Sequence, residues 1–255
     1  MLIPVLPPKR SPVPPQSADQ GLTLIECLVA IVMVALVAGS VAPVMVISVA
    51  SRVNSQKAEQ ALGLAQAEID RTRTQVERGE HTLATLPPEG RTTSGVITEK
   101  DKISEVLGPN LSETNSTSFA FARPVDINGN DQNDFLVQRF RSVGYKPTNA
   151  GANDPPVAFT MGVRVYDSQA TGTGNLPTDP ASLGMTGGTG QRSQRPLAAL
   201  YTTIAVGDNP DSLCDMIRHL NNQKTTPLSE ADLNLPPTCA APADDSSDDD
   251  SSDDD

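Results

Sequence analysis

Residues 21–51 read GLTLIECLVAIVMVALVAGSVAPVMVISVAS. This stretch holds no charged residue between Glu26 and its end. As a helix, its roughly 30 residues measure about 45 Å at a rise of about 1.5 Å per residue, which exceeds the ~30 Å hydrocarbon core of a bilayer. The stretch therefore predicts a single membrane-spanning helix over residues 22–51.

Glu26 is the one residue in this helix that a plain membrane anchor does not explain. An ionised carboxylate costs roughly 2.5–3.5 kcal/mol near the bilayer centre and less toward its edge. Because Glu26 lies a few residues inside the apolar run, we expect another group to compensate its charge. The alternative is a single-pass anchor with a stray glutamate near the interface.

The residues before the helix suggest how it is processed. Residues 1–20 are polar and proline-rich, and they carry Lys9 and Arg10. A secretory signal peptide has a short apolar core followed by a small-residue cleavage site, whereas Gly21 precedes a long apolar run. The order GLTLIE at residues 21–26 resembles the cleavage and methylation signal of type IV prepilins and type II secretion pseudopilins. The departure is Leu22, where these families usually have phenylalanine.

This resemblance implies a leader peptide over residues 1–21, cleavage after Gly21 and N-methylation of Leu22. It implies a structural subunit with no catalytic residues, held in the inner membrane by a single span with its C-terminal domain exported. The implied partners are a prepilin peptidase and methyltransferase, other pilins or pseudopilins, and an inner-membrane assembly platform. In an assembled filament, Glu26 of one subunit would pair with the amine of a neighbour. Pro43 matches a proline that many of these proteins carry inside the membrane helix.

Residues 52–79 predict that the helix continues beyond the membrane, because they are strong helix formers without proline. Arg73 and Glu77, and Glu68 and Arg71, are acid–base pairs at helical spacing. Gly79 is placed to end a long helix over residues 22–79. One apolar stripe follows three- and four-residue steps through Val53, Ala58, Ala61, Leu62, Ala65, Ile69, Thr72 and Val76.

Residues 80–240 predict an exported, loop-rich β domain. The connection over residues 80–118 is polar, with one helical turn expected over residues 101–107, and residues 167–196 form a long loop without a pattern. A short helix is expected over residues 211–220. The strand candidates are residues 118–123, 135–143, 157–166 and 197–206. The sequence thus predicts an α+β, pilin-like fold in which the long helix packs on a small antiparallel sheet.

The sheet region carries a looser resemblance. FTMGVRVYDSQA at residues 159–170 and RPLAALYTTIAV at residues 195–206 are similar to the cyanobacterial pseudopilins of hormogonium polysaccharide secretion. That similarity implies a minor pseudopilin of a type IV pilus or type II-like machine that supports polysaccharide secretion and gliding motility. The alternatives are a general type II secretion pseudopilin, a minor pilin for DNA uptake, and a membrane-anchored calcium-binding envelope protein that does not assemble.

Charge and composition exclude some functions. The net charge is −12, and eight of the 31 acidic residues lie between residues 244 and 255, which leaves −4 on the rest of the chain. The tail over residues 241–255 is self-repelling and predicts disorder. This acidic balance disfavours a nucleic-acid partner, which would need clustered lysine and arginine. His81 and His219 are far apart, and no nucleophile, P-loop or zinc-protease motif occurs.

Residues 126–134, DINGNDQND, are the one candidate metal loop. Asp126, Asn128 and Asn130 match positions 1, 3 and 5 of an EF-hand-like loop, which supplies the oxygen ligands that calcium prefers. Asp131 stands where the sharp-turn glycine is expected, and Asp134 would have to replace the missing bidentate glutamate. The alternative is a turn linking two strands that is rich in Asp and Asn.

Three cysteines indicate the compartment. Cys27 lies in the membrane run and is interpreted as a small apolar residue. Cys214 and Cys239 lie in the exported part, where a pair of thiols can oxidise, so we expect a disulfide between them. The alternative is two unpaired thiols, and no cysteine or histidine spacing indicates zinc.

Overall fold

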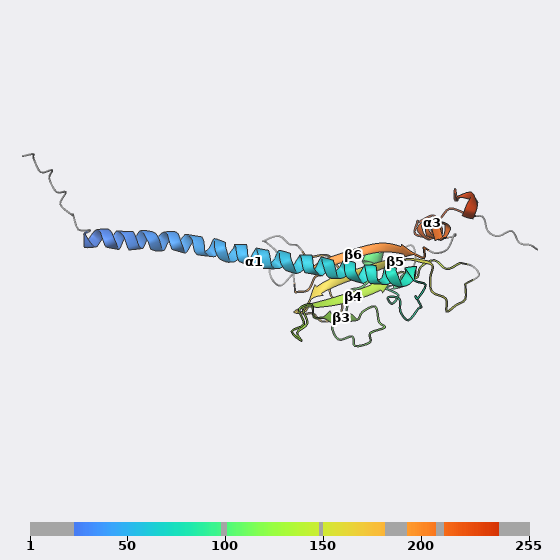
Figure 1. The fold of residues 1–255 in the computed structure, drawn as a ribbon, viewed down its shortest axis with the longest axis horizontal. Coiled ribbons are helices and arrows are strands. Elements are labelled where there is room, and N and C mark those ends of the chain that lie inside the picture. The colour runs from blue at the N-terminus through green and yellow to red at the C-terminus, as the bar shows by residue number, and fades with distance from the viewer. Residues whose placement is uncertain (1–22, 98–100, 148–149, 182–192, 208–211, 240–255) are drawn as a thin grey trace, which may run out of the picture. The chain divides into compact units, whose positions relative to one another are not determined.

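The computed structural model describes residues 23–97, 101–147, 150–181, 193–207 and 212–239. The chain divides into two compact units, residues 1–50 and 51–255. Its main helix, α1, runs over Leu24–Glu77 and is shared by both units (Figure 1). The expected helix over residues 22–79 therefore has its described bounds two residues inside each predicted end.

The part of α1 in the first unit is apolar and exposed. Every described side chain from Leu24 to Ala50 is exposed. The mean hydropathy of its most apolar window is 2.6, so α1 is long and apolar enough to cross a membrane. The helix continues without interruption through Gly39 and Pro43.

The C-terminal end of α1 is set by Gly79, as the sequence predicts. Gly79 adopts a left-handed φ of 67°, which glycine reaches without a steric cost. Its N–H donates to Val76 O at 3.0 Å, and the N–H of Glu80 donates to Gln75 O at 3.1 Å. These two bonds form a Schellman motif, which satisfies carbonyls that the helix leaves without partners.

The second unit is built on a four-stranded antiparallel sheet in the order β3-β4-β5-β6, a simple meander (Figure 1). Register pairs Val137 with Val165 and Val163 with Leu200. The strands are β3 Ala122–Val125, β4 Phe135–Arg141, β5 Ala158–Asp167 and β6 Ala198–Ala205. The α+β, pilin-like architecture is confirmed.

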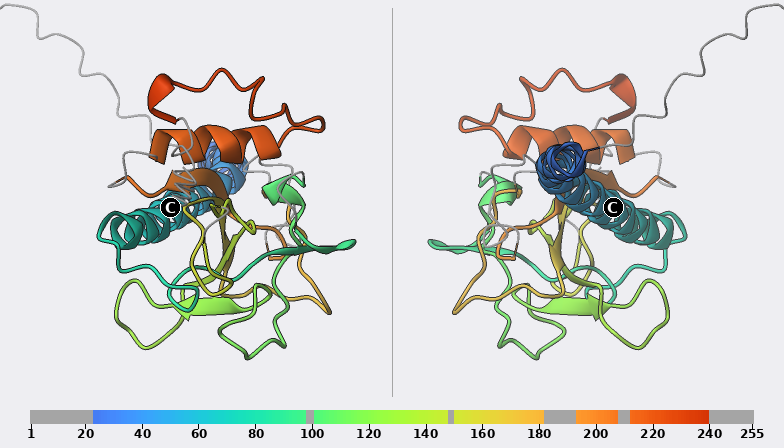
Figure 2. Two further views of the ribbon diagram at one scale, coloured as in Figure 1. Left: turned by 90° about the vertical axis from the view of Figure 1, so that its right-hand side faces the viewer. Right: turned by 90° about the vertical axis from the view of Figure 1, so that its left-hand side faces the viewer.

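Shorter elements complete the second unit. A two-stranded ribbon of β1 Arg91–Thr92 and β2 Gly95–Val96, together with the 3-10 turn η1 Ile103–Glu105, lies in the connection before the sheet. Helix α3, Ser212–Asn222, contacts β5 and β6, and a last turn η2 covers Pro237–Cys239. In Figure 2, α3 and the chain after it (orange to red) lie at the opposite end of the second unit from β3 (light green).

The main core forms where the apolar stripe of α1 meets one face of the sheet. Most of the predicted stripe is buried, but Val53 and Leu62 remain 47% and 41% exposed. The sheet contributes alternate residues of β4, β5 and β6, because alternate side chains of a strand share a face. The buried cluster consists of Ala61, Ala65, Ile69, Val76, Leu86, Phe135, Val137, Phe159, Met161, Val163, Val165, Ala198 and Ile204.

The first strand differs from its prediction. Residues 118–121 form a turn, in which Ser118 O accepts the N–H of Phe121 at 3.1 Å and Ser118 Oγ accepts the N–H of Ala120 at 3.2 Å. The strand begins only at Ala122 and includes Pro124. Proline is tolerated there because β3 is an edge strand. The strand prediction for residues 118–121 is therefore wrong.

Candidate functional site

The motif from which the sequence predicts a function, residues 21–26, ends in the first turn of α1. Thr23 caps the helix, since its carbonyl accepts the N–H of Glu26 at 3.0 Å and of Cys27 at 3.1 Å. Thr23 Oγ1 accepts the N–H of Glu26 at 3.3 Å as well. The spacing T-x-x-E at residues 23–26 is that of a helix-capping box, so the sequence itself carries a signal for the start of α1.

Glu26 therefore occupies a favourable position in the helix, but it takes no part in the ion pairs of the described residues. A carboxylate in the first helical turn is favoured by the helix dipole, typically by about 0.3–1 kcal/mol. Among the residues that the structure describes, no basic side chain forms an ion pair with Glu26. The apolar side chains around it are equally uncovered, with Leu24 85% and Ile25 64% exposed. In a membrane, a counter-charge would have to come from outside the described residues.

The structure gives less information on the other residues predicted to act in processing and assembly. Gly21 and Leu22, the predicted cleavage and methylation residues, lie outside the described part of the chain. Pro43 lies inside α1. Its predicted role in assembly stays a prediction.

The predicted calcium loop folds as a tight turn organised by Asp126. The Asp126 carboxylate accepts backbone N–H groups of Asn128, Gly129 and Asp131 at 3.0, 2.7 and 2.8 Å. Asp134 Oδ2 accepts the N–H of Ile127 at 3.0 Å and closes the loop. These bonds are those of the alternative interpretation, a turn rich in Asp and Asn.

The donor set for calcium is only partly assembled in this loop. Asp131 adopts a left-handed φ of 62° at the position where an EF-hand has its turn glycine, so the backbone follows the expected course. However, the Asn128 side chain directs Nδ2 toward Asp134 Oδ2 at 3.2 Å. The described residues contain no group of three or more His, Cys, Asp or Glu side chains that could hold a metal. Calcium binding through Asp126, Asn128, Asn130 and Asp134 stays a prediction.

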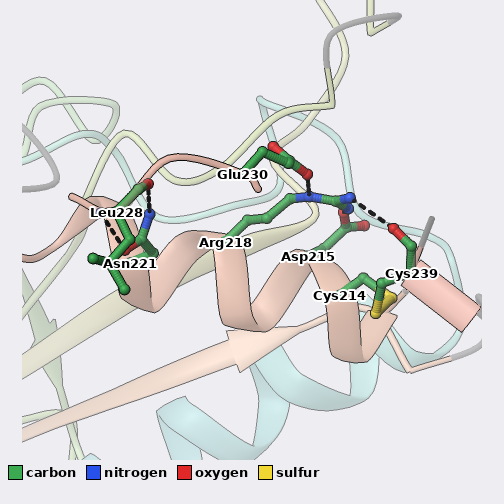
Figure 3. A network of polar contacts seen from close by, with 7 residues as sticks. All are labelled: Cys214, Asp215, Arg218, Asn221, Leu228, Glu230 and Cys239. Carbon is green, nitrogen blue, oxygen red and sulfur yellow. Dashed lines mark hydrogen bonds and ion pairs between the residues drawn. A yellow bond between two sulfur atoms is a disulfide. The ribbon is translucent and has the colours of Figure 1, made fainter. Parts of the chain in front are cut away.

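The chain that follows α3 is held to this helix by a disulfide and a network of polar contacts (Figure 3). Cys214 and Cys239 are joined, with their Cα atoms 5.3 Å apart. Arg218 links three parts of this segment through Asp215 at 3.5 Å, Glu230 at 2.6 Å and the carbonyl of Cys239 at 3.2 Å. We call α3 and residues 223–239 the C-terminal clasp.

Asn221 fastens the middle of the C-terminal clasp. Its side chain donates to Leu228 O at 2.9 Å and accepts the N–H of Leu228 at 3.0 Å. Asn221 is buried, whereas residues 224–232 are exposed. The clasp therefore depends on polar contacts and the disulfide more than on an apolar core.

The two histidines lie in different surroundings and do not form a catalytic pair. His81 follows the end of α1, and partial burial lowers its pKa below the ordinary value. His219 is fully buried in α3, with Nε2 3.3 Å from Thr160 Oγ1 and 3.0 Å from Gln223 Nε2. Hydrogen bonds to uncharged groups in this place fit a structural role.

A buried ion-pair cluster was not predicted. Glu68 of α1, expected to pair with Arg71, instead pairs with Arg123 of β3 and Arg139 of β4. Burial lowers the pKa of Arg139, and the adjacent Glu68 carboxylate partly opposes that shift. A glutamate beside the apolar stripe was the signal in the sequence, because such a residue needs a cation from the surface that it faces.

Comparison with known proteins supports this interpretation of the N-terminal segment. A family model described as the prokaryotic N-terminal methylation motif matches residues 16–42. The match supports the type IV pilin and pseudopilin family, and with it a structural subunit that a prepilin peptidase processes and that assembles with other pilins. No curated protein and no solved structure matches the chain.

Proposed function

We propose that this chain is a minor pseudopilin, a filament-forming subunit of a type IV pilus or type II secretion-like machine. The observation that carries the proposal is Glu26, an acidic residue in an exposed apolar helix, inside the matched methylation motif and without an ion-pair partner in the described chain. An anchor alone needs neither the motif nor the carboxylate. A subunit that must be aligned with its neighbours needs both.

The physical role of Glu26 is to set the axial position of neighbouring subunits. Cleavage after Gly21 gives Leu22 a cationic, methylated amine close to the start of α1. In a bundle of such helices, the amine of one subunit and the Glu26 carboxylate of another attract strongly, because the dielectric is low. Either charge left alone would cost several kcal/mol, so the paired register is favoured over neighbouring ones.

The finer part of the proposal concerns what the machine exports. The resemblance of residues 159–170 and 195–206 to polysaccharide-secretion pseudopilins supports a role in polysaccharide secretion and gliding motility. The net charge of −12 supports this function over DNA uptake, since DNA would be repelled. A general type II secretion pseudopilin differs from this proposal in its cargo.

Substitutions at Glu26 test the assembly mechanism. Glu26→Ala removes the carboxylate, and Glu26→Gln keeps its size while removing its charge. Both variants should insert into membranes, because loss of a charge eases insertion. Crosslinking to partner pilins in membranes should fall by about tenfold or more in both, as an unpaired buried amine costs over about 1.4 kcal/mol.

Glu59→Ala is the matched control, because Glu59 is an exposed glutamate of α1 in the second unit. It should crosslink like the unaltered chain. Full crosslinking of both Glu26 variants would instead favour the alternative function, a membrane-anchored envelope protein that does not assemble. If crosslinking falls while polysaccharide export and motility stay normal, the chain assembles but serves another cargo.

A further inference from the structure

The second face of the sheet, opposite the α1 core, holds a cleft that the assembly role does not use. Phe159 and Met161 of β5 and Ile204 of β6 are in the α1 core. Because alternate side chains of a strand share a face, Thr160 of β5 and Tyr201 of β6 point to the second face. η1 and the chain around it cover one part of the face, where Ile97 and Val106 form a buried cluster with Phe140 of β4. α3 covers another part, where His219 meets Thr160. The cleft of about 330 Å³ lies between these two covers.

The lining of this cleft is rich in hydroxyl groups. Five hydroxyl side chains reach it from four places in the chain, namely Ser104, Ser142, Thr160, Tyr201 and Thr203. Each hydroxyl can both donate and accept a hydrogen bond. Gln223 adds an amide, and Ile103 is the single aliphatic side chain in the lining.

The charge and polarity of the cleft narrow the class of ligand. Asp101 and Lys102 are its two charged residues, of opposite sign, so the lining carries no net charge. A phosphate or polyanion would require an excess of cations, and a lipid or other apolar ligand would require apolar walls. A neutral ligand with many hydroxyl groups matches this set of donors and acceptors.

Hydrogen bonds within the protein hold several of these groups in place. Thr160 Oγ1 accepts from Gln223 Nε2 at 2.9 Å and lies 3.5 Å from Thr203 Oγ1. Ser142 Oγ accepts the N–H of Thr160 at 3.1 Å. The lining side chains of the sheet and of the residue after α3 are thereby linked, so little ordering is needed when a ligand binds.

Tyr201 supplies a fixed aromatic surface. Its hydroxyl accepts from Arg164 Nε at 3.1 Å, and its ring lies 6.5 Å from that of Phe140, centre to centre. The residue is nevertheless 37% exposed. Within the described residues, neither the Tyr201 nor the Ser142 hydroxyl donates to a protein acceptor, so both protons are available to a ligand.

We propose that this cleft, which we name the hydroxyl cleft, binds a neutral saccharide unit. The aromatic ring would pack against the C–H face of a sugar, and the hydroxyl side chains would bond its hydroxyl groups. The volume is at the lower end of small-ligand pockets, which suits a mono- or disaccharide unit. Binding here does not depend on assembly through Glu26, so the two proposals can fail separately.

Saturation-transfer NMR on the full chain tests the proposal. The protein is kept in a phosphocholine detergent, which has no sugar headgroup, and the probes are cellobiose, maltose and chitobiose. At least one of them should bind with a Kd of about 1 mM. Digalacturonate, an acidic disaccharide, should bind more weakly, because the cleft has no excess of cations.

Two adjacent threonines of β6 provide a matched pair of variants. Thr203→Val removes a hydroxyl from the cleft, whereas Thr202→Val makes the same change on the opposite face of the strand. Thr203→Val should weaken binding by about 3- to 10-fold, the usual effect of one hydrogen bond, and Thr202→Val should not. Tyr201→Phe keeps the ring and should also weaken binding, which provides a second readout if Thr203→Val does not fold.

Three results would overturn the proposal. The first is the absence of saturation transfer to all three neutral disaccharides at about 20 mM, well above the expected Kd. The second is equal weakening by Thr202→Val and Thr203→Val, which would place binding elsewhere. The third is tighter binding of digalacturonate than of any neutral probe.

Discussion

Glu68 Oε2 on α1 lies 3.3 Å from Arg139 Nη1 on β4, and the Glu68 side chain is only 7% exposed. Arg123 of β3 pairs with the other oxygen of the same carboxylate. One buried acid thus joins the helix to two strands, at sequence separations of 55 and 71 residues. The pairing fixes how α1 lies along the sheet within the second unit.

Glu68→Gln should lower the free energy of unfolding by about 1.5–3 kcal/mol, the range for hydrogen bonds to charged groups. Its control is Asp70→Asn, which removes the exposed ion pair between Asp70 and Arg73. That change should cost less than about 0.5 kcal/mol. Urea unfolding of both variants, followed by circular dichroism in detergent, makes the comparison. Equal effects would show that the Glu68 cluster adds no more to stability than an exposed ion pair does.

Arg164→Lys should destabilise the second unit by about 2–4 kcal/mol through unpaired buried carbonyls. Arg164 is fully buried, and its guanidinium donates to Val106 O and Ser104 O at 2.8 Å each. It also lies 4.6 Å from the centre of the Phe140 ring. Lysine keeps the charge but lacks the planar fork that reaches both carbonyls.

Trypsin cleavage after Lys102 gives a local readout of the Arg164 change. Because Arg164 holds η1 and the residue after it, cleavage there should become faster in Arg164→Lys. Arg195→Lys is the control, since Arg195 is 36% exposed and its partner Asp179 lies 3.8 Å away. Unchanged cleavage and stability in Arg164→Lys would contradict the anchoring role.

Loss of the disulfide should release the C-terminal clasp and leave the sheet folded. The chain-entropy model assigns about 3.5 kcal/mol to a cross-link that closes a loop of this length. In the double variant Cys214→Ser and Cys239→Ser, trypsin should cut after Lys224 faster, while unfolding of the sheet changes little. Cys27→Ser is the control, because Cys27 is exposed and free. Loss of the whole fold in the double variant would show that the clasp is part of the core.

Calcium at millimolar concentration should raise the melting temperature of the full chain in detergent if residues 126–134 form the predicted site. Asp126→Ala should abolish that rise. It should also lower stability without calcium, since the Asp126 carboxylate accepts three backbone N–H groups. The comparison is a melting curve with calcium and with chelator. No shift in the unaltered chain, or the same shift in Asp126→Ala, would leave the segment as a turn only.

Periodicity was enough to predict the main elements. The three- and four-residue steps from Val53 to Val76 predicted most of the buried face of α1, apart from the exposed Val53 and Leu62, and Gly79 predicted its end. These signals are local, since spacing and backbone conformation decide them. The strand candidates over residues 135–143, 157–166 and 197–206 likewise located β4, β5 and β6 to within a few residues.

Contacts between residues that are distant in the chain could not be predicted from the sequence. Glu68 had a suitable partner three residues away, but a buried carboxylate pairs with the cations of the surface that it faces. The sequence also did not indicate that Arg164 of β5 is fully buried beneath the chain around η1. The hydroxyl cleft was missed for the same reason, because its residues are distant in the chain.

Mass spectrometry of the mature N-terminus tests the central claim most directly. The chain extracted from membranes should begin at Leu22 and carry one additional methyl group on its terminal amine. This product requires both processing steps that the matched motif implies. Two results would contradict the claim: an N-terminus at Met1, which leaves the terminal amine far from Glu26 in the chain, and a cut beyond Ser40, which removes Glu26.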